Sequence, residues 1–183
     1  MKNDQKSEEE TKRPFEDTVS ITNPDWSREH IDKFWHPSAK LINAIRSYQR
    51  WSNKKNILSP FMKRIAIFRH TFWSTISGAD IPIKTKIGGG LLLPHPNGIV
   101  IHPDSIIGIN CLILQQVTLG TKSDNNRAPV IGSHVDIGAG AKILGEVKIG
   151  NHVQIGANAV VLQDIPDNCD AVGIPARVIN RKK

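Results

Sequence analysis

A histidine that interrupts an aliphatic run is the first residue of this sequence with evident chemical potential. His95 lies between two prolines in "LLLPHPNGIVIHP", residues 91–103. An imidazole, with an ordinary pKa of about 6.5, can take a proton from a hydroxyl at neutral pH, so a rigidly held histidine could act as a general base. A core histidine with a purely structural role is the alternative. The elements that hold His95 must distinguish the two.

The residues after position 80 carry an internal repeat of six. Aliphatic side chains occupy the repeat position in three runs: Ile81, Ile87, Leu93, Ile99; Ile101, Ile107, Ile113, Leu119; and Ile131, Ile137, Ile143, Ile149, Ile155, Val161. A helix repeats near 3.6 residues and a strand at two, so this period indicates short strands joined by tight corners, with the frequent following glycine permitting the corner. Three hexapeptides would form one coil of about 18 residues, and stacked coils would bury the aliphatic side chains. The sequence therefore predicts a mainly β solenoid over residues 79–183.

The repeat is interrupted twice. A two-residue slip follows Ile99, just after His95, and the polar stretch "GTKSDNNRAPV" at 120–130 predicts an extruded loop. Loops on a rigid scaffold are where binding sites are commonly built. Both interruptions therefore favour a functional role for His95.

The sequence resembles the serine acetyltransferase branch of the hexapeptide-repeat acyltransferases. The resemblance rests on the period of six and on "GIVIHPDSIIGINCLILQQVTLG", "VIGSHVDIGAGAKILGEVKIGNHVQIGANAVVLQDIP" and "AVGIPARVI", and it covers residues 57–180. It implies a left-handed parallel β-helix, a homotrimer with active sites between neighbouring subunits, and acetyl transfer from acetyl-CoA to a hydroxyl.

The resemblance also implies roles for particular residues. In that family the histidine of a segment like "PHPNGIVI" is the general base and an aspartate fifteen residues upstream orients it, which gives His95 and Asp80 here. Such a carboxylate fixes the tautomer of the imidazole and stabilises the imidazolium that forms. Asn97 and Arg127 are the expected acceptor contacts. Coenzyme A is expected on small and basic residues along "GAGAKILG" and beside it: Gly120, Gly138, Ala139, Gly140, Ala141, Lys142, Ala157 and Arg177.

Two positions depart from the serine acetyltransferase pattern. Those enzymes carry an aspartate before the catalytic histidine and a second histidine in a "DRHP"-like loop, and both contribute to serine binding; this sequence has Pro94 and Ala128 there. Because the ammonium and carboxylate of serine need partners, the favoured acceptor is a sugar hydroxyl of a nucleotide sugar, a lipid-linked intermediate or a surface polysaccharide. Free serine, as in cysteine biosynthesis, is the alternative acceptor.

A metal-binding or scaffold protein is the alternative from another class. His134 and His152 occupy equivalent positions of consecutive coils and would stack on one outward face, which invites a metal ligand pair. A third ligand is not evident, so exposed turn histidines are the favoured interpretation and no metal is expected.

Residues 26–78 predict a helical region of a different character. Apolar residues recur at helical spacing in two stretches split near "SNKKNILSP": Leu41, Ile42, Ile45 and Tyr48, then Phe61, Ile65, Phe68 and Phe72. Eight Lys and Arg and no acidic residue lie between Pro37 and Ala79. The favoured interpretation docks both apolar faces on the rest of the protein and leaves the basic faces in solvent. Contact of the basic helices with an anionic membrane surface or lipid-linked substrate is the alternative.

Composition sets the remaining expectations. The net charge of +7 permits an anionic partner but identifies none, and no nucleic-acid partner is expected. Residues 1–25 are polar and predict a disordered leader rather than a signal peptide. No apolar run approaches the length of a membrane span, and two cysteines are too few for a disulfide framework. A soluble cytoplasmic protein, in contact at most with the inner face of the membrane, is expected.

Overall fold

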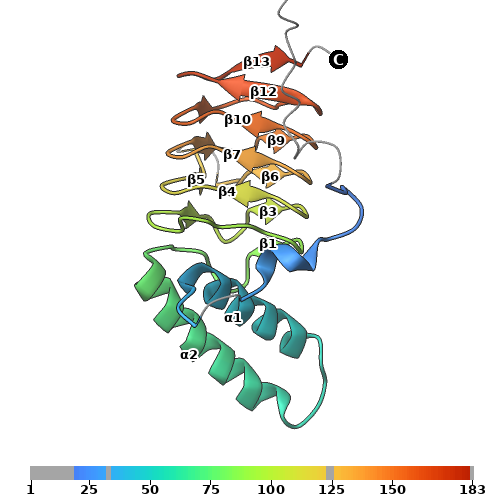
Figure 1. Cartoon of the computed structure of the whole chain (residues 1–183), viewed down its shortest axis with the longest axis vertical. Coiled ribbons are helices and arrows are strands. Elements are labelled where there is room, and N and C mark those ends of the chain that lie inside the picture. Colours follow the sequence, from blue (N-terminus) through green and yellow to red (C-terminus); the bar gives the residue numbers. More distant parts are fainter. Residues whose placement is uncertain (1–18, 32–33, 123–125, 182–183) are drawn as a thin grey trace, which may run out of the picture.

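Two helices and a stack of short strands make up the protein, seen here in a computed structural model that describes residues 19–31, 34–122 and 126–181. A short 3-10 helix η1 (Trp26–Glu29) precedes α1 (Pro37–Ser52) and α2 (Ser59–Ser77). The strands are β1 (Lys86–Ile87), β2 (Val100–Ile101), β3 (Ile106–Ile107), β4 (Leu112–Ile113), β5 (Thr118–Gly120), β6 (Val130–Ile131), β7 (Asp136–Ile137), β8 (Lys142–Leu144), β9 (Lys148–Ile149), β10 (Gln154–Ile155), β11 (Val160–Val161), β12 (Cys169–Val172) and β13 (Arg177–Asn180). The helices lie beyond the first coil, at the end opposite β13 (Figure 1).

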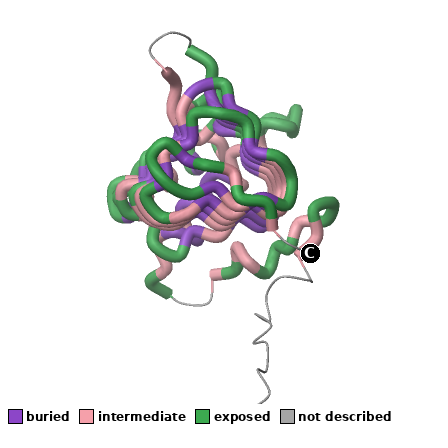
Figure 2. The backbone as a smooth tube through the Cα atoms, turned by 90° about the horizontal axis from the view of Figure 1, so that it is seen from above, coloured by how far each residue is buried: buried purple, intermediate pink, exposed green. Residues whose placement is uncertain are grey.

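The strands form three parallel sheets, one for each side of a triangular coil. Their orders are β1-β3-β6-β9, β2-β5-β8-β11 and β4-β7-β10-β12, and β13 closes the third sheet in the antiparallel direction. The expected left-handed parallel β-helix with an N-terminal helical region is confirmed. All fourteen repeat positions of the sequence are buried, and the buried segments superimpose from coil to coil when the chain is viewed from above (Figure 2).

Strand pairing explains both interruptions of the repeat. In the regular part of the stack, Val130 of β6 pairs with Lys148 of β9, and this spacing along the chain is one undisturbed coil. The step from Lys86 to its partner Ile106 is two residues longer, and the step from Ile106 to its partner Val130 is six residues longer. The first coil therefore holds the two extra residues near His95, and the second holds six extra residues before β6. Of this second insertion, residues 123–125 lie outside the described part.

The glycines that follow the aliphatic residues serve close stacking rather than the corners, which corrects the sequence interpretation. A Cβ added to Gly108 would lie 2.3 Å from the carbonyl oxygen of Gly132 on the next coil. The left-handed corner conformation falls three residues after the aliphatic position and is taken mostly by Asn and His: Asn110, Gln116, His134, His152, Asn158 and Asn168, with φ between 52° and 59°. Short polar side chains tolerate this conformation better than other non-glycine residues.

His134 and His152 occupy one such corner on neighbouring coils. Their Nδ1 atoms lie 2.7 Å apart, so one ring donates a hydrogen bond and the other, unprotonated at that nitrogen, accepts it. Burial lowers the pKa of His134; nearby Asp136 raises it, whereas His152, Arg28 and Arg181 lower it further. This geometry therefore requires at least one of the two imidazoles to be neutral.

The two helices dock differently on the β-helix. Leu41, Ile42 and Ile45 of α1 are buried, as expected. The expectation for α2 is wrong, because Phe61, Phe68 and Phe72 are exposed. α2 instead buries its face of small side chains, which includes Ala66 and Ser77. The helix ends at Gly78, a left-handed cap whose N–H donates to the Ser74 carbonyl.

Part of the expected disordered leader is held by the β-helix. The buried Asn110 amide accepts from the Asp25 N–H at 2.7 Å and donates to the carbonyls of Ser20 and Asn23. Residues 19–25 therefore lie against the corner at Asn110, which their polar composition did not indicate. Residues 1–18 lie outside the described residues.

We expect Gly108→Ala to lower the free energy of unfolding by about 2–4 kcal/mol, because the new methyl group meets the backbone of the next coil. Gly120→Ala is the matched control, because its Cβ would first meet the flexible Leu144 side chain at 3.2 Å. Thermal and urea unfolding of the two variants should differ clearly. Equal stabilities would contradict the stacking role.

We expect the protein to lose stability as the pH falls through about 6.5, partly through His134. Since the folded state binds a proton at His134 more weakly than the unfolded chain does, protonation favours unfolding, and this contribution is absent at higher pH. His134→Asn should keep the corner, where Asn stands at Asn110, Asn158 and Asn168. The variant should show a shallower fall of melting temperature between about pH 7 and pH 5. An unchanged slope would refute this contribution.

Candidate active site

His95 lies at the corner of the first coil between two sheets. Leu92 pairs with Leu112 of β4, and Val100 begins β2, so the intervening segment turns from one sheet to the other. The carbonyl of Asn97 accepts from the Gln116 N–H at 3.0 Å, and the N–H of Gly98 donates to the Gly78 carbonyl at 2.7 Å. His95 itself is exposed. The interpretation of His95 as a buried core histidine is therefore excluded.

Asp80 is fixed to the strand that follows the His95 segment. Its N–H donates to the Ile99 carbonyl at 2.8 Å and its carbonyl accepts from the Ile101 N–H at 2.9 Å, in a parallel bridge to Val100. Within the described chain, neither the Asp80 carboxylate nor the His95 imidazole has a side-chain hydrogen bond or ion pair. The structure thus brings the two chain segments side by side, and the direct pairing of their side chains remains a prediction.

The corner of His95 continues along the β-helix as an edge of small residues. On the coils that follow the Asn97–Gln116 contact, the Gly140 N–H donates to the Gln115 carbonyl and the Asn158 N–H donates to the Ala139 carbonyl, both at 2.8 Å. Three residues expected to bind coenzyme A share this edge with His95: Ala139, Gly140 and Ala157. The Lys142 ammonium is held nearby, where it donates to the Gln116 carbonyl at 2.5 Å.

A groove of about 410 Å³ runs beside this edge, on the face of β4, β7, β10 and β12. Leu112, Leu114, Gly138 and Gly156 contribute to its lining. An extended, partly apolar arm fits a groove of this kind, because glycine lets the arm approach the backbone closely. Coil stacking also requires small residues here, since a Cβ on Gly138 would lie 2.6 Å from the Ala157 nitrogen.

The other expected site residues lie elsewhere in the single chain. Ala141 is buried in the core, with its N–H bonded to Gly138 and its carbonyl to Thr118. Gly120 ends β5 on another sheet, and Arg177 is exposed on β13 at the last coil. Arg127 lies before β6 and forms an exposed ion pair with Glu146 at 2.6 Å. One chain therefore assembles part of the expected site and leaves the loop residues on a different corner.

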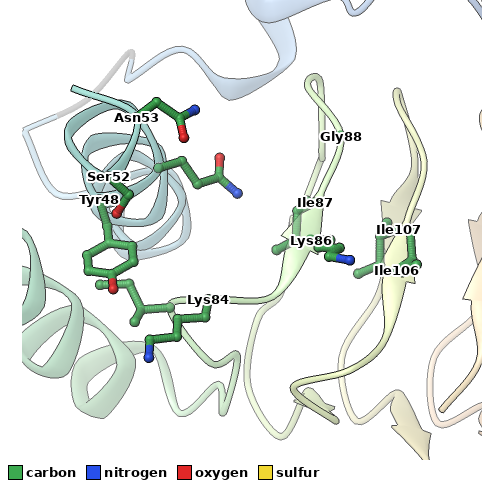
Figure 3. Close-up of a pocket in the computed structure, with 11 residues that line it drawn as sticks. Tyr48, Ser52, Asn53, Lys84, Lys86, Ile87, Gly88, Ile106 and Ile107 are labelled. Carbon is green, nitrogen blue, oxygen red and sulfur yellow. The ribbon is translucent and has the colours of Figure 1, made fainter. Parts of the chain in front are cut away.

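A second cavity, of about 670 Å³, was not indicated by the sequence. Figure 3 shows Tyr48 and Ser52 of α1 and the following Asn53 on one side, with Lys84 beside Tyr48, and Lys86 of β1 on the other side, next to β3. In the sequence these residues are separate polar positions without a recognisable spacing. The cavity contains no predicted catalytic residue.

The histidine pair offers no complete metal site in one chain. Within residues 19–31, 34–122 and 126–181, no group of three or more His, Cys, Asp or Glu side chains is placed to hold a metal ion. Both cysteines are buried and free, and burial raises the pKa of Cys111 to about 12, so its thiol is a poor nucleophile. Of the groups considered from the sequence, His95 is the exposed titratable group at the edge of small residues.

Comparison with known proteins agrees with this geometry. Residues 128–163 match the family described as bacterial transferase hexapeptide (six repeats). Serine acetyltransferase of Escherichia coli K12 is 43% identical over 157 residues, which are 82% of this chain and 56% of the relative. Serine acetyltransferase of Synechococcus elongatus is 45% identical over 108 residues, 58% of this chain and 44% of the relative.

Solved structures show the same relationship. Soybean serine acetyltransferase complexed with serine matches with a TM-score of 0.67 and 35% identity, over 79% of this chain and 58% of that chain. A serine acetyltransferase in complex with CoA matches with a TM-score of 0.65 and 35% identity, over 80% and 58%. The chain spans about half the length of these relatives, between 44% and 58%. Its repeat, its sheets and these matches together show that the chain belongs to the hexapeptide-repeat transferases, within the serine acetyltransferase family.

Proposed function

We propose that the protein transfers an acetyl group from acetyl-CoA to the hydroxyl of serine, with His95 as the general base. The observation that carries the proposal is the placement of an exposed histidine, held between two prolines, at the head of an edge of small residues beside a groove. Binding of CoA and of serine by the related structures supports the two substrates.

The chemistry needs one group that takes a proton and returns it. The unprotonated nitrogen of the His95 imidazole accepts the proton of the hydroxyl, and the hydroxyl oxygen attacks the thioester carbonyl. The carbon–sulfur bond then breaks, and the imidazolium returns the proton to the departing thiolate. The role of Asp80 is to accept a hydrogen bond from the other ring nitrogen, and the pairing of its backbone with the strand after His95 supports this role.

The complete site is formed in a homotrimer, in which a neighbouring subunit brings its loop to the His95 corner. Asn97 lies next to His95, whereas Arg127 lies on another corner of the same chain. A closed threefold assembly would place both beside one acceptor. The small residues along the edge would receive the pantetheine arm, and Lys142 and Arg177 would attract the phosphates. Both free thiols fit a reducing cytoplasm.

A sugar hydroxyl is the second candidate acceptor, and two observations favour it. Pro94, directly before His95, offers no side-chain hydrogen bond, and the Ala128 methyl group is buried. A free amino acid brings two charged groups into the site, and each needs a partner to offset its desolvation. The relatives favour serine, whereas these two positions favour an uncharged hydroxyl.

A panel of acceptors separates the two candidates. With acetyl-CoA and serine, release of the CoA thiol should exceed background hydrolysis, and the product should be O-acetylserine by mass spectrometry. Nucleotide sugars serve as the comparison. Acetylation of a sugar but not of serine would reject serine and retain the transferase, whereas no thiol release with any acceptor would count against the whole proposal.

Replacement of His95 with Ala should lower kcat/KM by about 10²–10⁴ while the melting temperature stays nearly unchanged, because the imidazole is exposed. Asp80→Asn should cost less, since the base remains but loses the charge of its orienting partner. His102→Ala is a matched control, because His102 is a partly exposed histidine on the coil after the catalytic corner. Full activity of the His95 variant, or a large loss in the control, would contradict the mechanism.

A further inference from the structure

The unburied face of α2 carries a continuous apolar stripe. Phe61, Ile65, Phe68, Phe72 and Ile76 recur at intervals of three and four residues, so they lie on one side of the helix. All five are exposed, and Phe68 is 74% exposed. Such a row of large side chains on a helix surface marks an interaction site.

The stripe is unpartnered because α2 docks through its other side. Ala66 and Ser77 are buried there, the His70 ring bonds to the Ile81 carbonyl at 2.8 Å, and Trp73 packs against the core of the β-helix. Just before the helix, Ile57 and Leu58 extend the apolar surface, with Ile57 95% exposed. The helix therefore has two separate surfaces: one docks on the β-helix, and the other is apolar and exposed.

Basic residues surround the stripe and acidic residues are absent from it. Helical geometry places Arg64 and Arg69 on opposite flanks of the stripe, and Lys54 and Lys55 lie just before α2. The eight basic residues between Pro37 and Ala79 exceed the net charge of +7 of the whole chain, so the remainder is close to neutral. A complementary partner has an apolar layer that receives the stripe, and negative charge beside that layer that pairs with the basic residues.

A bilayer that contains anionic phospholipid has this chemistry, and we propose that α2 docks the protein on such a surface. The helix would lie in the plane of the interface, with the stripe inserted among the acyl chains and the flanking guanidinium groups at the phosphates. No described helix is long and apolar enough to cross a membrane. The helices lie at the end of the molecule opposite β13, so the coils would extend away from the bilayer (Figure 1).

A second copy of the chain is the competing occupant, and charge disfavours the simplest form of it. Two α2 faces packed together would bring Arg64 and Arg69 of both copies close, with no acidic residue on either helix to offset them. Docking on lipid is independent of the proposed acetyl transfer, so it can be tested without acceptor or acetyl-CoA.

Sedimentation of the full chain with vesicles tests the proposal. The protein should bind vesicles of phosphatidylcholine with phosphatidylserine and bind phosphatidylcholine alone weakly, and binding should fall when salt rises from about 0.1 M to about 0.5 M. Phe68→Ser/Phe72→Ser should lower the partition coefficient at least about tenfold. Ile174→Ser/Ile179→Ser is the matched control, because both residues are exposed aliphatics at the far end of the β-helix, and it should bind like the unchanged protein.

A labelled variant gives a second readout that does not depend on removing the stripe. Cys111 and Cys169 are buried, so an environment-sensitive dye can be attached at Phe68→Cys, with Ile174→Cys as the control position. Anionic vesicles should shift the emission of the first label to the blue and leave the second unchanged. Absence of binding to anionic vesicles, or equal binding by the double Ser variant, would overturn the proposal. If light scattering without lipid shows that the double Ser variant forms a smaller assembly than the unchanged protein, the stripe mediates contacts between copies, and the proposal is overturned as well.

Discussion

The close stacking of consecutive coils is the constraint on which the rest of this structure depends. Successive coils approach so closely along the Gly88, Gly108, Gly132 and Gly150 column that a methyl group on Gly108 or Gly132 would meet the backbone of the next coil. This approach keeps the parallel strands in hydrogen-bonding distance and places each aliphatic residue over its equivalent. Because the register of the inward residues is fixed, the register of the outward residues is fixed as well, and each corner residue lies over the corner residue of the previous coil.

The candidate site is a consequence of that outer register. His95, Gln116, Gly140 and Asn158 come from four segments far apart in the sequence, yet they follow one another along a single edge. No loop has to fold around a ligand to create this edge. The two-residue insertion in the first coil changes only the segment that holds His95, between Leu92 and Val100, and the strands on either side keep their pairing. A rigid scaffold with one local irregularity therefore presents the His95 side chain.

Periodicity was sufficient to predict a solenoid, and the family resemblance supplied the left-handed parallel β-helix, but neither was sufficient to complete the site. All fourteen aliphatic residues that the period of six picks out are buried, because burial in a solenoid depends on position within the repeat. The pattern assigned the left-handed corners to glycine, whereas His134 and Asn158 occupy two of them. A repeated glycine can be required by a positive φ or by a lack of space for a Cβ, and the pattern alone does not tell which. The exposure of the α2 stripe contradicts the favoured interpretation: the spacing predicts an amphipathic helix, but Phe68 and Ala66 lie on different faces and the sequence does not say which face docks. Arg127 and His95 lie on different corners of one chain, and the proposed relation between them involves a neighbouring subunit, which no pattern within one chain can locate.

The helical hairpin and the β-helix differ in charge as well as in structure. The helical hairpin carries the excess positive charge, whereas the β-helix is nearly neutral and orders its polar groups into ladders such as Ser133–Asn151–Asp167. Those ladders satisfy polar atoms at the corners from within the stack. The exposed His95 and the apolar stripe of α2 lie outside these ladders and face solvent. The His95 segment is connected to the end of α2 by a direct hydrogen bond, because the Gly98 N–H donates to the carbonyl of Gly78, the cap of the helix.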